Sequence, residues 1–125
     1  MKIKTSKLTG QALDWAVALA QGWQKMADYN GYSTPNGVVL VSEYAPSWDW
    51  EVCGRLIEEF TMDLTPVIGG TYCAGSSITD GALCPDDYVH IDMYGDTPQI
   101  AICRAVVAAK LGDEVEIPDE LVEAK

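Results

Sequence analysis

The chain of 125 residues has little positive charge: eight lysines and arginines in total stand against nineteen aspartates and glutamates. The formal net charge of −11 argues against binding to a nucleic-acid backbone, because such binding needs a surface rich in lysine and arginine. The same charge disfavours attachment to an anionic membrane surface. Two kinds of partner remain: a basic protein surface, or a small ligand in a pocket whose local charge differs from the average.

Motifs for catalysis and metal binding are also missing. The four cysteines, Cys53, Cys73, Cys84 and Cys103, form no CxxC pair, so a zinc ribbon or a thioredoxin-like motif has no support. The single histidine, His90, and the lack of a nucleophile motif give catalysis little support. We therefore predict a non-enzymatic protein with no cofactor or bound metal, and with reduced cysteines in the cytoplasm.

Long hydrophobic runs are absent as well, since no segment approaches the roughly 20 apolar residues that span a bilayer. The basic start MKIKTSK precedes an apolar stretch, but Asp14 interrupts that stretch and favours an amphipathic helix over a signal peptide. The length and the 48% hydrophobic share predict a single globular domain over residues 1–125.

Apolar periodicity and turn residues predict the element order α-β-α-β-β-α. Thr9 and Thr97 are suited to begin helices and Gly112 to end one, whereas the middle helix is expected to open at Ser47. This order predicts an α+β sandwich, in which helices pack against a small, mainly antiparallel sheet. The predicted helices are 9–26, 47–60 and 97–111, and the predicted strands are 38–44, 65–75 and 88–94.

Three blocks of the sequence carry a family resemblance. KTSKLTGQALDWAVA (4–18), YAPSWDW (44–50) and GDTPQIAICRAVVAAKLGDEVEIPDEL (95–121) resemble the NinX-like proteins of tailed bacteriophages. The last block is also similar to the helix of the phage ABA-sandwich domain, in which helices cover a small sheet. The resemblance implies a phage or prophage origin, residence in the bacterial cytoplasm and an accessory role without an assigned reaction. A weaker similarity, in size and general layout, is to phage sponges that sequester nucleotide signals of bacterial immunity.

Arg104 is the residue on which we base the predicted site. It lies on the same helical stripe as Ile100 and Cys103, and an unpaired guanidinium buried there would cost several kcal/mol. Three arrangements would satisfy it. The guanidinium pairs with an internal carboxylate such as Asp14 or Asp49, it reaches the surface, or it lines a cleft and binds a ligand phosphate or carboxylate.

Structural roles are expected for the other notable residues in the middle of the chain. Arg55 has a glutamate four residues to either side, which predicts an exposed ion pair. Of the tryptophans in APSWDW, we expect one to lie in the core and the other to cover a hydrophobic edge, because Asp49 would repel a phosphate at that helix start.

We predict a non-catalytic accessory protein, for which one function is favoured and a second is kept as the alternative. The first is capture of a small phosphorylated ligand or cyclic nucleotide of bacterial immunity, with Arg104 on the phosphate, Trp48 or Tyr44 stacked on the base, and Thr97 as a further contact. The second is an acidic inhibitor or adaptor that docks on a basic host protein, which the charge of −11 supports more strongly. A homo-oligomer is expected in either case.

Overall fold

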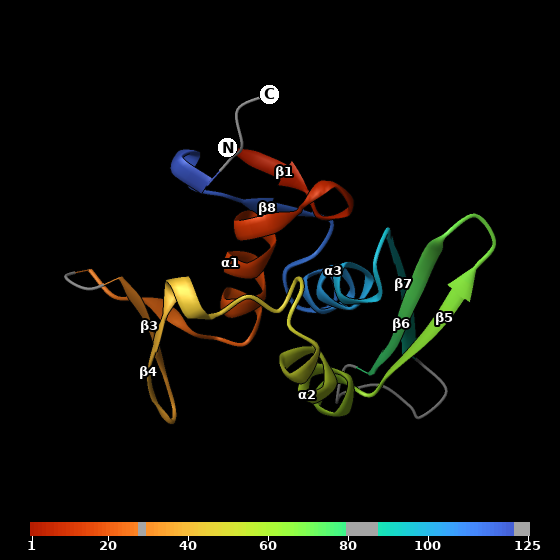
Figure 1. Cartoon of the computed structure of the whole chain (residues 1–125), viewed down its shortest axis with the longest axis horizontal. Helices are drawn as coiled ribbons and strands as arrows, with labels where there is room; N and C mark the ends of the chain where they lie inside the picture. Colours follow the sequence, from red (N-terminus) through yellow and green to blue (C-terminus); the bar gives the residue numbers. More distant parts are fainter. Residues whose placement is uncertain (28–29, 80–87, 122–125) are drawn as a thin grey trace.

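The computed structural model describes residues 1–27, 30–79 and 88–121. Within these ranges it contains three α-helices and three small antiparallel sheets. The helices lie at the centre of the molecule, and the hairpin of β3 and β4 and the sheet of β5, β6 and β7 extend to opposite sides (Figure 1). The α+β class is confirmed, and the antiparallel pairing is divided among three sheets.

The sequence predicted the first residues of two of the three helices correctly. Thr9 is the N-cap residue of the first helix, and Thr97 caps the third by accepting a hydrogen bond from the Ile100 amide at 3.2 Å. The middle helix begins later than expected, because Asp49 is its N-cap and accepts a hydrogen bond from the Glu51 amide at 3.0 Å. The helices are α1 (Gly10–Ala20), α2 (Trp50–Phe60) and α3 (Pro98–Leu111).

The first helix is shorter than predicted. It ends at Ala20 rather than near Met26, because Gly22 takes a φ of +84° and turns the chain into a strand. The strand predicted at 38–44 is also shorter, since a 3-10 turn, η2 (Val41–Glu43), follows its first residues. The sheet on this side consists of β2 (Gln24–Lys25), β3 (Gly31–Thr34) and β4 (Gly37–Leu40).

The second three-stranded sheet packs against α3. Its strands are β5 (Met62–Val67), β6 (Thr71–Thr79) and β7 (Tyr88–Gly95), in that order. Gly69 and Gly70 have φ values of +102° and +84° and turn β5 back onto β6, so the single broken strand expected at 65–75 is a hairpin. Gly95 permits close packing, because a Cβ atom there would lie only 2.6 Å from the backbone nitrogen of Ala101.

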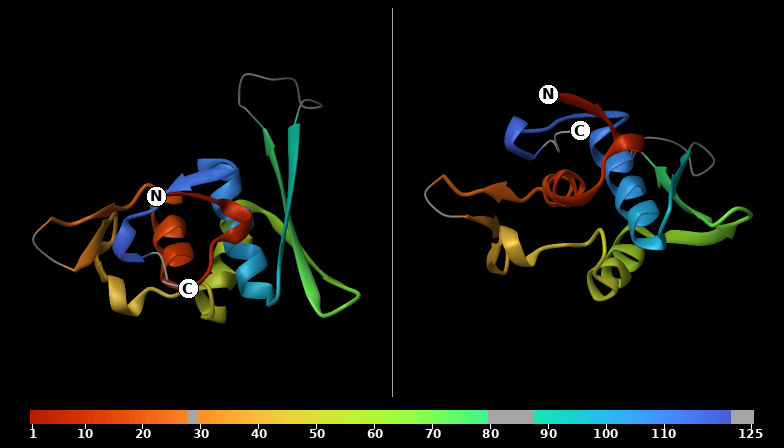
Figure 2. Two further views of the ribbon diagram at one scale, coloured as in Figure 1. Left: turned by 90° about the horizontal axis from the view of Figure 1, so that it is seen from above. Right: turned by 45° about the horizontal axis from the view of Figure 1, so that its top comes forward.

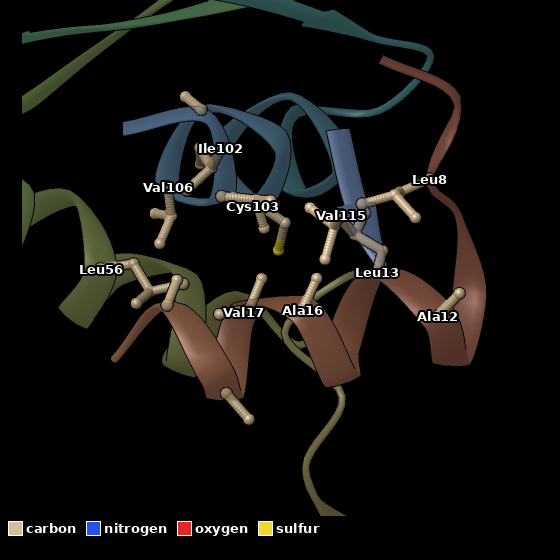
Figure 3. Close-up of a cluster of buried hydrophobic side chains, with 14 of the residues drawn as sticks. Leu8, Ala12, Leu13, Ala16, Val17, Leu56, Ile102, Cys103, Val106 and Val115 are labelled. Atoms are coloured by element: carbon tan, nitrogen blue, oxygen red, sulfur yellow. The ribbon is translucent and has the colours of Figure 1, made fainter. Parts of the chain in front are cut away.

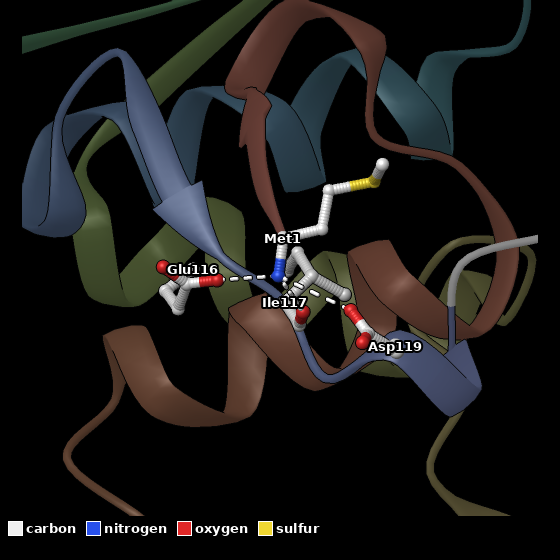
Figure 4. A network of polar contacts seen from close by, with 4 residues as sticks. All are labelled: Met1, Glu116, Ile117 and Asp119. Carbon is white, nitrogen blue, oxygen red and sulfur yellow. Dashed lines mark hydrogen bonds and ion pairs between the residues drawn. The ribbon is translucent and has the colours of Figure 1, made fainter.

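The two ends of the described chain meet in a third, two-stranded sheet. β1 (Lys2–Lys4) pairs with β8 (Glu114–Glu116), and short 3-10 turns, η1 (Thr5–Lys7) and η3 (Asp119–Leu121), flank them. The terminal ammonium of Met1 donates hydrogen bonds to the Glu116 carboxylate and to the carbonyl oxygen of Ile117 (Figure 4). Figure 2 shows this sheet lying beside the helices.

The core is formed where the three helices meet (Figure 3). Leu13 and Val17 of α1, Leu56 of α2, and Ile102 and Val106 of α3 have almost no exposed surface. The thiols of the helical cysteines are free and buried in the same region, as their apolar positions predicted, and Cys84 lies outside the described residues. None of the helices described here is long and apolar enough to cross a membrane.

Candidate functional site

Arg104 projects from α3 and binds backbone atoms of two other segments. Its Nε donates a hydrogen bond to the carbonyl oxygen of Leu8 at 3.0 Å, and Nη1 donates to the carbonyl oxygen of Tyr94 at 2.8 Å. The side chain is half-buried; this burial lowers the pKa of the guanidinium, and the nearby charge of Asp96 raises it. Arg104 therefore links α3 to β7 and to the segment that leads into α1.

The hydrogen bonds of Arg104 go to neither of the carboxylates considered as its partners, Asp14 and Asp49. Asp14 accepts a hydrogen bond from the backbone amide of Ser47 at 2.8 Å, and Asp49 caps α2. Backbone carbonyl groups need hydrogen-bond donors, and the guanidinium is a donor to two of them, in β7 and before α1. A phosphate bound by Arg104 would have to compete with these two bonds.

Thr97 also has a role within the fold. Its hydroxyl oxygen accepts a hydrogen bond from the Ile100 amide, which is one of the backbone N–H groups without a partner inside the helix at the start of α3. Close by in sequence, the Gln99 side chain donates to the carbonyl oxygen of Trp48 at 3.2 Å and so joins the starts of α3 and α2.

Tyr44 and Trp48, by contrast, share one cavity of about 150 Å³, which we call the Asp14 cavity. The described residues that line it include neither Arg104 nor Thr97. Its walls come from α1, β3, the segment before α2 and η3. The side chains that matter below are Gln11, Asp14, Trp15, Tyr32, Tyr44 and Trp48.

The Tyr44 ring is already packed inside the protein. Tyr44 is only 8% exposed, and its ring centroid lies 4.8 Å from that of Trp23 and 6.1 Å from that of Tyr32. The Gln21 side chain donates a hydrogen bond to the Tyr44 hydroxyl oxygen. Burial raises the pKa of Tyr44 and also raises that of Tyr32, to about 12, so both phenols are neutral at physiological pH. Tyr44 therefore offers the cavity only part of its surface.

Asp14 is the charged group of this cavity. Asp14 as a residue is 8% exposed, and burial raises its pKa to about 6, although hydrogen bonds from Ser47 act in the opposite direction. In the sequence, Asp14 was a candidate partner of Arg104 and a break in the apolar run of the first helix, and its place in a cavity was not predicted. An acidic residue within the apolar run of an amphipathic helix was the one signal in the sequence that could have indicated a buried carboxylate.

The two tryptophans around the start of α2 are exposed, so the prediction that one is in the core is wrong. Trp48 is 72% exposed and Trp50 is 50% exposed. Because α2 begins at Trp50, the helix turns Cys53 and Leu56 inward and leaves both indoles outside. The predicted ion pair of Arg55 is confirmed: Nη2 lies 3.1 Å from a carboxylate oxygen of Glu51, and both side chains are largely exposed.

A second, more open hollow of about 510 Å³ lies beside β1 and β8. It is lined by Lys4, Thr5, Ser6, Met93, Asp113 and Glu114, which include side chains of both charges. No group of three or more histidine, cysteine, aspartate or glutamate side chains is placed to hold a metal ion within the described ranges.

Comparison with known proteins places the chain in a family. No curated protein matches it. Residues 4–110 match the family described as "Bacteriophage P22, NinX". This range begins in β1 and ends one residue before the end of α3. It contains both exposed tryptophans and every residue that lines the Asp14 cavity except Leu121. The chain therefore belongs to the NinX family of bacteriophage proteins.

Proposed function

We propose that this phage protein is a non-catalytic accessory factor that docks on a basic host protein through the surface at the start of α2. We define this docking surface by Trp48, Asp49, Trp50 and Glu51. The observation that carries the proposal is that Trp48 and Trp50, two positions apart, are 72% and 50% exposed. Large exposed aromatic side chains are typical of the centres of protein interfaces.

The charge of the chain supports a basic partner. A net charge of −11 attracts a positive surface over about one Debye length and speeds the encounter, an effect that salt weakens. Asp49 and Glu51 are the sequence neighbours of the two tryptophans, and Glu51 forms an exposed ion pair with Arg55. Apolar contact and opposite charge thus favour the same kind of partner.

Sequestration of a nucleotide signal is the alternative function, favoured by Tyr44 and Trp48 lining one cavity. The cavity of about 150 Å³ is smaller than the roughly 300–1,000 Å³ of most ligand pockets. A carboxylate, Asp14, lines it where a phosphate would need a cation, and Arg104 bonds to backbone carbonyls instead. Docking on a protein is therefore the better supported function.

Affinity purification from the bacterial host tests the proposal. We expect the wild-type protein to retain a basic host protein in a stoichiometric ratio at low salt and to release it at high salt. The double variant Trp48→Ala/Trp50→Ala should lose this protein. Ile68→Ala is the control, because it removes a fully exposed apolar side chain from the distant β5–β6 turn. A nucleotide released by heat, with no protein bound, would support sequestration instead.

Self-association and a cytoplasmic location are further parts of the proposal. Besides the docking surface, Val38 and Tyr94 are exposed and supply apolar surface for a second copy. Sedimentation analysis over a range of protein concentrations tests the oligomer, and fractionation of infected cells tests the location.

A further inference from the structure

We infer that the Asp14 cavity receives the cationic end of a lysine or arginine side chain from the partner protein. This inference rests on the proposed docking function and names the chemistry by which the partner is recognised. It follows from the charge inside the cavity, its aromatic walls and its size.

The first argument is charge. Asp14 is buried, with 8% of the residue exposed, and its carboxylate accepts a hydrogen bond from the Ser47 amide. None of the residues described as lining the cavity is a lysine, arginine or histidine. A buried carboxylate without a cation is unfavourable, and an ammonium or guanidinium that enters the cavity would supply the missing charge. A phosphate or carboxylate ligand would be repelled.

The second argument is the aromatic lining. Trp15, Tyr32 and Trp48 border the same cavity as Asp14. Aromatic faces attract ammonium and guanidinium groups, and tryptophan does so most strongly. The apolar stem of a lysine or arginine also packs well against such rings while its charged end reaches the carboxylate. Trp48, at 72% exposure, has the freedom to cover a side chain that has entered.

The third argument is size. A cavity of about 150 Å³ is known to hold a single benzene ring, so the Asp14 cavity can hold the end of one side chain. Trp48 borders the cavity and also belongs to the docking surface, so a partner seated on that surface lies at the cavity mouth. A basic residue projecting from the partner is therefore the occupant that fits both sites.

Peptide titration followed by NMR tests the inference on the intact protein. The probe is acetyl-Gly-Ser-Arg-Ser-Gly-amide, and the matched peptide carries citrulline, which is uncharged, in place of arginine. We expect the arginine peptide to shift the indole N–H signals of Trp15 and Trp48, and the citrulline peptide to leave them unchanged.

Two variants with the same change in net charge separate the cavity from general attraction. Asp14→Asn should weaken binding of the arginine peptide by at least about tenfold. Asp49→Asn should weaken it by less than about threefold, because asparagine still caps α2 and the lost charge lies outside the cavity. Equal effects of the two variants would overturn the inference.

A third variant guards against a loss of binding caused by misfolding. Trp48→Ala removes an exposed wall of the cavity without touching the core, and should weaken peptide binding by about threefold or more. No effect of Trp48→Ala would count against the inference. Ethylguanidinium, which reproduces the end of an arginine side chain, should compete with the peptide, and a lack of competition at saturating concentration would overturn the inference.

Failure of this inference differs from failure of the proposed function. A host protein retained equally by wild type and by Asp14→Asn, but lost from Trp48→Ala/Trp50→Ala, would leave the docking function intact and remove the cavity from it. A chain that retains no host protein at all would remove the docking function itself.

Discussion

At the scale of single residues, Arg104 joins α3 to β7 and to the segment before α1 through two hydrogen bonds. Its place among Ile100 and Cys103 correctly indicated that the guanidinium needs partners. The partners are the carbonyl oxygens of Leu8 and Tyr94, and every residue carries such an oxygen. The side chains alone therefore suggested carboxylates as partners, although in the fold the guanidinium donates its hydrogen bonds to backbone carbonyl oxygens.

Replacing Arg104 should lower stability rather than remove a ligand. Arg104→Met leaves two carbonyls without their charged donor, and we expect the free energy of unfolding to fall by about 2–3 kcal/mol, allowing for partial exposure. Arg55→Met is the control, and its exposed ion pair should be worth no more than about 0.5 kcal/mol. Urea denaturation measures both, and similar losses for the two variants would contradict the role given to Arg104.

Asp14 should make stability depend on pH. Because burial raises its pKa from 3.8 to about 6, the folded protein keeps a proton that the unfolded chain has lost between these two values. Asp14 thus lowers the free energy of unfolding as the pH rises through this window, by about 2–3 kcal/mol in total. The loss is complete above about pH 6 and absent below about pH 4.

The variant Asp14→Asn isolates this effect from the other carboxylates. Its free energy of unfolding, relative to wild type, should rise by about 2–3 kcal/mol between about pH 4 and about pH 7. Parallel urea titrations at both pH values give the difference. A difference that stays constant with pH would mean that Asp14 has an ordinary pKa.

At the scale of elements, long segments with clear end signals could be predicted, and short ones could not. Thr97 and Gly112 mark the two ends of α3 as the sequence indicated. The start of α2 was misplaced because Ser47 and Asp49 are both good caps, and which one is used depends on the contact of Ser47 with Asp14. β1 and β8 have three residues each and form only because distant parts of the chain meet.

Two glycines should respond in opposite ways to the same substitution. Gly95→Ala places a Cβ atom 2.6 Å from the Ala101 nitrogen, which forces β7 away from α3 and should lower the free energy of unfolding by about 2–3 kcal/mol. Gly54→Ala, in the middle of α2 with no atom within 4 Å of the new carbon, should raise it by up to about 1 kcal/mol. Thermal unfolding of both variants tests the packing of α3 against the sheet.

At the scale of the whole molecule, the proposal of a basic partner rests on composition, and the proposed docking surface rests on the fold. The charge of −11 favours a basic protein as the alternative partner that the sequence suggested. The Asp14 cavity could not be predicted, because its lining runs from Gln11 to Leu121 and depends on how α1, β3 and η3 come together. Of the four predicted contact residues, Tyr44 and Trp48 line this cavity, whereas Arg104 and Thr97 bond within the fold.

Hydrogen exchange of the protein, alone and in complex with the host protein that it retains, tests the docking surface most directly. We predict that slower exchange on binding is concentrated in residues 44–51 and in the neighbouring first turns of α1, which together border the Asp14 cavity. The β5–β6 turn should exchange at the same rate in both states. Slower exchange confined to the sheet of β5, β6 and β7, with residues 44–51 unchanged, would contradict the proposal that this protein docks through its exposed tryptophans.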